Sequence, residues 1–186
     1  PIFMMSWQGP DTRTNLPATY AADVFSFILN QNASKLSQSL IDAGLALQFD
    51  LSYLTLKHVG PISFVVVPNP SKIKECFAEM KRQIALWDTD NYVTDEQIEI
   101  AKRKLDIRMI EEQEITSDFV QTLSFWWASA SLDYFTTYGE NLRKVKRADM
   151  QAYVRQYIKN KPFAAGLLIN PGMRSQIEPE EFFKAN

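Results

Sequence analysis

The side chains that most often carry enzyme chemistry are scarce in this chain. It contains one histidine, His58, and one cysteine, Cys76. A zinc site needs three or four converging His, Cys or carboxylate ligands, and both H-x-x-E-H and H-E-x-x-H need two histidines. His58 lies in the turn-forming stretch "HVGP", and Cys76 follows a helical pattern in which small buried thiols are common. We therefore expect neither a metal centre nor a Ser–His–Asp triad, which would have to use the turn histidine.

Two other stretches have compositions that occur in functional sites. The acidic run "EEQE" at 111–114 suggests paired carboxylates, but it falls at a predicted helix end among polar residues, as a solvated face would. The run "FWW" at 125–127 suggests stacking on bases or sugars, yet its helical spacing with Phe119 and Leu123 favours core packing. The six glycines are dispersed, so there is no phosphate-binding loop. Residue types alone indicate no catalytic constellation.

The composition is that of a globular protein. Of the 186 residues, 46% are hydrophobic and 23% charged, and the net charge is −2. Because the basic residues are scattered, we expect no nucleic-acid or anionic-membrane surface. No apolar run approaches the ~20 residues that span a bilayer, and no signal-peptide pattern is present. We expect a soluble chain of unknown compartment.

The start of the chain predicts a fragment. The sequence opens on proline and enters the strand-like stretch "PIFMMSW" at once. We therefore interpret residues 1–186 as one α+β domain cut from a longer protein.

The elements that would position any site follow clear periodicities. Residues 45–53 alternate apolar and polar, which predicts a strand with a bulge or bend after Tyr53, and "HVGP" leads into a second strand, "ISFVVV". Further strands are expected near residues 2–7 and 163–170. Helices are expected after Asn15, over 34–43 with a left-handed cap at Gly44, from Ser71, from Thr94, from Ser117 and over 148–158. The helix from Ser117 is expected to carry one apolar stripe from Phe119 to Tyr134. This order predicts an α+β fold, a mainly antiparallel sheet with helices packed on one face.

Several stretches, taken in order, resemble the non-catalytic C-terminal half of the pitrilysin/insulinase family of zinc peptidases, the inverzincins. "MMSWQGPDT" is similar to the opening strand and turn of that half, and "SKLSQSLIDAGLALQFDLSY" at 34–53 to the helix and strand after it. "YVTDEQIEIAKRKL" resembles a family helix. Residues 138–172 resemble the family's run from a helix through v-T-x-e-D-v into a terminal strand and P-G. The likeness spans nearly the whole chain, and mitochondrial processing peptidase and the respiratory core proteins share it.

The resemblance implies a function that is shared between two halves. Family members pair two similar α+β halves or subunits around an enclosed chamber, as homo- or heterodimers in some cases. The first half carries H-x-x-E-H and binds zinc, which lowers the pKa of its water, while the motif's glutamate acts as general base. The second half binds no metal, closes the chamber and contacts the peptide. The resemblance thus implies no cofactor in this segment and zinc in its homologous partner half.

The family's second half often supplies an Arg and a Tyr that hold the substrate, in the frame S-x-L-x-x-x-L-R followed by G-L-A-Y. Ser34, Leu36 and Leu40 match this frame, but the Arg position is Ile41 and the Tyr position is Leu47. Neither side chain donates a hydrogen bond to a peptide carbonyl or an oxyanion. We also expect Leu47 to pack on the apolar strand face. The substitutions place transition-state assistance from this half in doubt.

Three hypotheses remain open at this point. The chain is the chamber-forming, substrate-contacting half of a zinc endopeptidase, or a catalytically inactive structural subunit of the same fold, or a peptide-binding module that uses a strand edge or a polar sheet face. An H-x-x-E-H motif upstream or in a neighbouring gene would favour the first. The candidate substrate-contacting residues are Gln48, Asp50 and Ser52, on the polar face of the alternating strand, and the alternative for them is a solvated surface.

Overall fold

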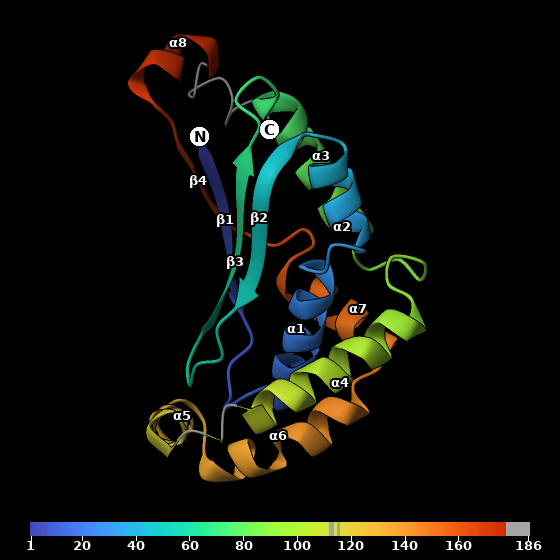
Figure 1. Ribbon diagram of the computed structural model, residues 1–186, viewed down its shortest axis with the longest axis vertical. Coiled ribbons are helices and arrows are strands. Elements are labelled where there is room, and N and C mark those ends of the chain that lie inside the picture. Colours follow the sequence, from blue (N-terminus) through green and yellow to red (C-terminus); the bar gives the residue numbers. More distant parts are fainter. Residues whose placement is uncertain (112–113, 115, 178–186) are drawn as a thin grey trace.

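The predicted α+β architecture is confirmed in the structure, a computed structural model that describes residues 1–111, 114 and 116–177 (Figure 1). Four strands form one antiparallel sheet in the order β2-β3-β1-β4. Their bounds are β1 (Ile2–Gly9), β2 (Ala46–Tyr53), β3 (Gly60–Pro68) and β4 (Ala164–Leu168). The β2–β3 hairpin places the predicted alternating strand at one edge of the sheet.

Most of the helices lie on one side of this sheet, with α1 at the centre of that layer, while α5 and α8 lie beyond the two ends of the strands (Figure 1). α1 contacts β2, α4, α6 and α7. The helices described are α1 (Leu16–Leu29), α2 (Lys35–Ser37), the π-helix Gln38–Asp42, α3 (Ile73–Leu86), α4 (Asp95–Glu111), α5 (Thr116–Ser129), α6 (Leu132–Lys144), α7 (Arg147–Tyr157), the 3-10 turn Pro171–Met173 and α8 (Arg174–Ile177). Among these residues, no helix is both long and apolar enough to cross a membrane.

The core lies between the sheet and the helices because every second strand residue points toward them. In β3 the residues alternate without exception between buried and half-buried. At its centre, the ring of Trp87 contacts Phe25 of α1 in an edge geometry and Phe64 of β3 in a tilted one. The opposite face of the sheet carries no helix in the described part of the chain (Figure 1).

Two predicted helix boundaries are confirmed at the level of hydrogen bonds. Gly44 has φ +64°, the left-handed conformation that favours glycine after a helix. The Gln97 backbone N–H donates to the Thr94 hydroxyl at 3.1 Å, and the Thr94 N–H donates to the Gln97 side chain at 2.9 Å, which closes the predicted capping box. The first turn of α4 thus satisfies its free backbone donors locally.

Three local features differ in detail from the predictions. The ladder of β2 is irregular between Ala46 and Gln48, at the start of the strand, and β2 ends at Tyr53, after which a bulge or bend was expected. The helix expected at 34–43 is one short α-turn followed by a π-helix. The helix expected from Ser117 begins at Thr116, and the stripe that continued to Tyr134 is divided into α5 and α6.

The aromatic run at 125–127 is only partly in the core. Trp126 packs against the core, whereas Trp127 is 72% exposed and Phe125 38% exposed. On a helix, adjacent residues are separated by about 100°, so neighbouring rings cannot all face the same partner. In the acidic run at 111–114, Glu111 and Glu114 are exposed, and residues 112 and 113 lie outside the described residues.

Candidate functional site

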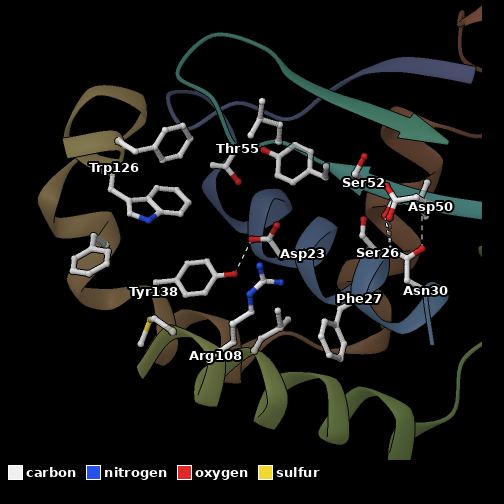
Figure 2. A pocket seen from close by; sticks show the side chains of 17 residues that line it. Asp23, Ser26, Phe27, Asn30, Asp50, Ser52, Thr55, Arg108, Trp126 and Tyr138 are labelled. Atoms are coloured by element: carbon white, nitrogen blue, oxygen red, sulfur yellow. Dashed lines mark hydrogen bonds between the residues drawn. The ribbon is translucent and has the colours of Figure 1, made fainter. Parts of the chain in front are cut away.

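A cavity of about 370 Å³ opens where the edge strand β2 meets the helical layer (Figure 2). Helix α1 forms its floor, and β2, α4, α5 and α6 form its walls. Its polar lining includes Asp23, Ser26, Asn30, Asp50, Ser52, Thr55, Arg108 and Tyr138, and its apolar lining includes Phe27, Leu105, Met109, Phe125, Trp126 and Phe135. This volume accommodates a group of the size of a large side chain or a small organic ligand.

Asp23 is the most perturbed acid of the cavity. The Tyr138 hydroxyl donates a hydrogen bond to its Oδ2 at 2.8 Å, and within the described residues the carboxyl has no ion pair (Figure 2). Burial raises the pKa of Asp23 from 3.8 to about 7, and the hydrogen bond from Tyr138 offsets only part of this increase. Near neutral pH the carboxyl is therefore poised between its neutral and charged forms.

The hydroxyl groups around Asp23 form the second polar feature of the site. Ser26 lies one turn further along α1 and lines the same cavity, and its residue is only 7% exposed. Its hydroxyl has no hydrogen-bond partner in the described part of the chain, and neither has that of Tyr153. Native proteins leave few buried polar groups unpaired, so each one needs an explanation, and a bound water or ligand is one of the explanations for a group that lines a cavity, as Ser26 does. The Ser26 hydroxyl and the Asp23 carboxylate can therefore accept further hydrogen bonds from a donor inside the cavity.

Asn30 closes the edge of the sheet beside the cavity. Its Nδ2 donates to the Leu51 carbonyl at 2.9 Å, and its Oδ1 accepts from the Leu51 N–H at 2.9 Å. A third, longer contact at 3.3 Å joins Nδ2 to the Asp50 carboxylate. The side chain thus occupies the two edge positions that an added strand would use at Leu51, which protects this edge from strand addition at that point.

Substitution of Asn30 by alanine is expected to lower the free energy of unfolding by about 1–2 kcal/mol, because two backbone groups of the edge strand lose their partner. Urea unfolding measures the change. Asn30→Asp is the matched variant, since it retains an acceptor for the Leu51 N–H but has no donor for the carbonyl. An alanine variant as stable as the wild type would show that water replaces the amide without cost.

The structure places the three predicted substrate-contacting residues on one exposed row of β2. Gln48, Asp50 and Ser52 are all exposed, and Leu51 between them is buried. Asp50 and Ser52 also line the cavity, whereas Gln48 does not. Their role in binding stays a prediction. The sequence reading missed Asp23, although an aspartate inside the otherwise apolar helical stretch "TYAADVFSF" was a visible signal.

The two positions where the family often carries Arg and Tyr differ in environment. Ile41, in the π-helix, is half-buried and packs against the core. Leu47 is 65% exposed, so the prediction that it packs on the apolar strand face is wrong. The register shift between Ala46 and Gln48 leaves Leu47 outside the regular alternation, and its side chain turns to solvent.

The open face of the sheet joins these residues to the neighbouring strands. Register pairs Ser52 with Ser63 and Ser63 with Ser6, which gives a cross-strand row of hydroxyls. Asp50 pairs with Val65 and Val65 with Met4, which gives a parallel row that becomes apolar toward β1. The face thus combines hydrogen-bonding groups with apolar surface, as contact with an extended peptide requires.

The residues present do not form a metal centre. Among the described residues, no group of three or more His, Cys, Asp or Glu side chains could hold a metal ion. His58 is exposed in the β2–β3 turn, where its Nδ1 lies 3.4 Å from the Arg13 guanidinium, and Cys76 is buried in α3. The donor set for zinc therefore does not fit this part of the protein.

Comparisons with solved structures show the same fold in several peptidases. A protease from Helicobacter pylori superposes with a TM-score of 0.78 at 18% identity, over 88% of this chain and 40% of its own. The inactive peptidase domain of a candidate zinc protease from Bordetella parapertussis gives a TM-score of 0.80 at 17% identity, over 91% of this chain and 90% of its own. A chain of complex III from Candida albicans gives 0.68 at 10% identity, over 89% and 42%. This chain therefore spans less than half of the Helicobacter and Candida chains.

At the level of sequence, none of the curated proteins compared matches this chain. The model of a protein family does match, over residues 1–105, and that family is described as the peptidase M16 inactive domain. The match covers β1 to most of α4, including the edge strand and the helix α1, which line part of the cavity. The chain belongs to the peptidase M16 family, the pitrilysin/insulinase group of zinc peptidases, and carries its inactive domain.

Proposed function

We propose that this chain is the C-terminal, non-catalytic half of a zinc-dependent endopeptidase, which closes the substrate chamber and contacts the peptide. The open sheet face carries the proposal: one side of the sheet is covered by helices, while the other presents the row Ser6, Ser63 and Ser52 beside Gln48 and Asp50. Membership of a family of inactive peptidase domains supports it. The zinc site then lies upstream or on a partner subunit.

In this arrangement the two halves divide the work. When bound to the partner half, zinc would supply a Lewis acid and an activated water. The residues of this chain bind and orient the peptide. The Gln48 amide donates and accepts hydrogen bonds, the Ser52 hydroxyl does the same, and the Asp50 carboxylate accepts from peptide N–H groups. Such contacts hold an extended peptide in register, which lowers the entropic cost of reaching the reactive geometry.

A catalytically inactive structural subunit is the second candidate. The replacement of the family's Arg and Tyr by Ile41 and Leu47 favours it, because neither side chain assists an oxyanion. The fold shared with a chain of complex III is compatible with it. Peptide addition at the β2 edge receives less support, since Asn30 already pairs with the Leu51 backbone.

The test joins this chain to a homologous half that carries H-x-x-E-H, from the parent chain or a neighbouring gene. We expect peptide turnover by the assembly and none by either half alone. Triple substitution of Gln48, Asp50 and Ser52 by alanine should raise KM about tenfold, with kcat within about twofold, because uniform binding is lost. Steady-state kinetics on a fluorogenic peptide library measures both constants.

The matched control replaces three exposed residues of α4, Glu96, Arg103 and Lys104, which lie away from the sheet face. It should leave KM unchanged. An unchanged KM and substrate preference in the strand variant would remove the role of the three residues. An assembly that forms with the H-x-x-E-H half but shows no turnover would favour the structural subunit.

A further inference from the structure

We propose that the cavity between β2 and the helices binds an organic cation, an ammonium or guanidinium group on an apolar stem, with Asp23 as its counter-ion and Ser26 as a further acceptor. The cavity shares Asp50 and Ser52 with the open sheet face, but the two residues proposed to hold the cation, Asp23 and Ser26, take no part in the proposed peptide contacts.

The charge of the lining favours a cation. Two carboxylates, Asp23 and Asp50, line the cavity with one guanidinium, Arg108 (Figure 2). Within the described residues the Asp23 carboxyl receives one hydrogen bond, from Tyr138, so further lone pairs remain for a donor. The buried and unpaired Ser26 hydroxyl lines the same space. A positive group that donates several hydrogen bonds satisfies both, and Arg108 disfavours a second positive group.

The apolar walls fit the stem of such a ligand. Trp126 and Tyr138 line the cavity with their rings 6.1 Å apart, and Phe135 adds a third aromatic side chain. Aromatic faces attract organic cations through their quadrupole, most strongly where water is excluded. The volume of about 370 Å³ is large enough for one aromatic or aliphatic amine.

Burial gives the proposed site a pH dependence. The pKa of Asp23 is raised to about 7, so a cation that requires the ionised carboxylate should bind more tightly above that pH. The phenols that interact electrostatically with Asp23 have pKa values raised by burial and stay neutral across this range; they belong to Tyr20, Tyr53, Tyr134, Tyr138 and Tyr153. Arg108 from α4 and Asp50 from β2 are the other charged side chains that line the cavity.

Calorimetric titration of the full chain with phenethylammonium chloride tests the proposal. At pH 8 we expect a Kd on the order of 0.1–1 mM, the range for a small ligand held by one charged contact and an apolar stem. At pH 6 the affinity should fall about tenfold, as the Asp23 carboxyl takes up its proton. The uncharged analogue 2-phenylethanol should bind at least about tenfold more weakly than the amine at pH 8.

Three variants keep the test specific. Asp23→Asn should weaken binding of the amine about tenfold or more, and Ser26→Ala about threefold. Asp42→Asn, which removes an exposed carboxylate from the π-helix, is the control for net charge and should bind as the wild type does. Circular dichroism confirms that each variant is folded.

A second titration identifies the source of the cation. An acetylated, amidated hexapeptide with one lysine is compared with the same peptide carrying norleucine. Binding of the lysine peptide alone assigns the site to a peptide side chain, and binding of the free amine assigns it to a small molecule. Binding of neither probe by the wild type, or equal binding by Asp23→Asn, would overturn the proposal whatever the result of the peptidase assay.

Discussion

Replacement of Asp23 by asparagine is expected to remove a loss of stability that the wild type undergoes as the pH rises from about 4 to about 7. The carboxyl has a pKa near 3.8 in the unfolded chain and about 7 in the fold, where burial disfavours its charge. Below pH 4 it is protonated in both states. As the pH rises, the unfolded chain loses the proton first, so the folded state loses relative stability until the folded pKa is passed.

The magnitude follows from the size of the shift. A change of about three pKa units corresponds to roughly 2–4 kcal/mol, allowing for the partial access of solvent through the cavity. Asparagine preserves the shape and still accepts the hydrogen bond from Tyr138. The difference in unfolding free energy between variant and wild type should therefore grow in favour of the variant from pH 4 to pH 8.

Urea unfolding of both proteins at a series of pH values measures this difference. Asp42→Asn, at an exposed position, is the control and should show a difference within about 0.5 kcal/mol at every pH. A flat difference for Asp23→Asn would mean that the carboxyl titrates in the fold as it does in the unfolded chain. In that case solvent would reach it more freely than the cavity geometry indicates.

The free-energy cost of ionising this half-buried acid is understandable if a bound ligand offsets it. A carboxyl without an ion pair in the described residues destabilises the fold whenever it is charged, and an apolar residue would avoid this. Perturbed acids cluster at binding and catalytic sites because such environments tune their charge. The stability measurement reports the cost of ionising Asp23 without a counter-ion. The amine titration reports the gain when a counter-ion binds to the same carboxyl.

Regular periodicity was sufficient to predict the sheet and most of the helices. The alternation of residues 45–53 identifies β2 and correctly places Gln48, Asp50 and Ser52 opposite the buried Leu51. It fails at Leu47, because a bulge inserts one residue without changing the residue types around it. A hydrophobic pattern indicates which faces of a strand are apolar. It does not indicate where the register between two paired strands shifts by one residue.

The division of α5 from α6 had a local signal that the hydrophobic stripe obscured. The Ser131 hydroxyl accepts a hydrogen bond from the Tyr134 N–H at 3.0 Å and caps α6, so a new helix starts where one continuous stripe was expected. Because α5 packs mainly on α6, Trp127 has no buried surface to occupy. In this segment the serine cap, and not the apolar pattern, determines where the new helix begins.

The cavity was beyond prediction from sequence because its residues come from distant segments. Asp23 and Tyr138 are separated by 115 positions and meet only through the packing of α1 on α6. Their pairing depends on the tertiary arrangement of α4, α5 and α6 around α1. An isolated aspartate in an apolar helix can be flagged from sequence, but its partner and its pKa cannot be derived there.

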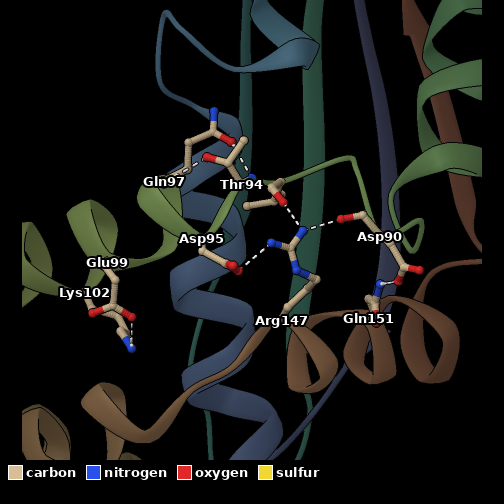
Figure 3. Close-up of polar contacts among 9 residues, drawn as sticks. Asp90, Thr94, Asp95, Gln97, Glu99, Lys102, Arg147 and Gln151 are labelled. Carbon is tan, nitrogen blue, oxygen red and sulfur yellow. Dashed lines mark hydrogen bonds and ion pairs between the residues drawn. The ribbon is translucent and has the colours of Figure 1, made fainter.

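Substitution of Arg147 by alanine is expected to lower the free energy of unfolding by about 1–2 kcal/mol, because three acceptors lose one shared donor and one of them, the Val93 carbonyl, is partly buried. Arg147 stands at the start of α7, and its guanidinium donates to the backbone carbonyls of Asp90 and Val93 and forms an ion pair with Asp95 (Figure 3). These residues connect α3 to α4. The Arg147 side chain thus links the α3–α4 connection to the start of α7.

A lysine variant separates the contribution of the hydrogen-bond geometry of Arg147 from that of its charge. Arg147→Lys keeps the charge but has no planar fork to reach two carbonyls and a carboxylate together, so it should recover less than half of the lost stability. Arg143→Ala removes a largely exposed ion pair with Asp106 and should cost no more than about 1 kcal/mol. Chemical denaturation at low and at high salt distinguishes the two, since salt screens the exposed pair and leaves the carbonyl contacts of Arg147 in place. Full recovery by lysine would assign the role to charge alone and contradict the proposed clamp.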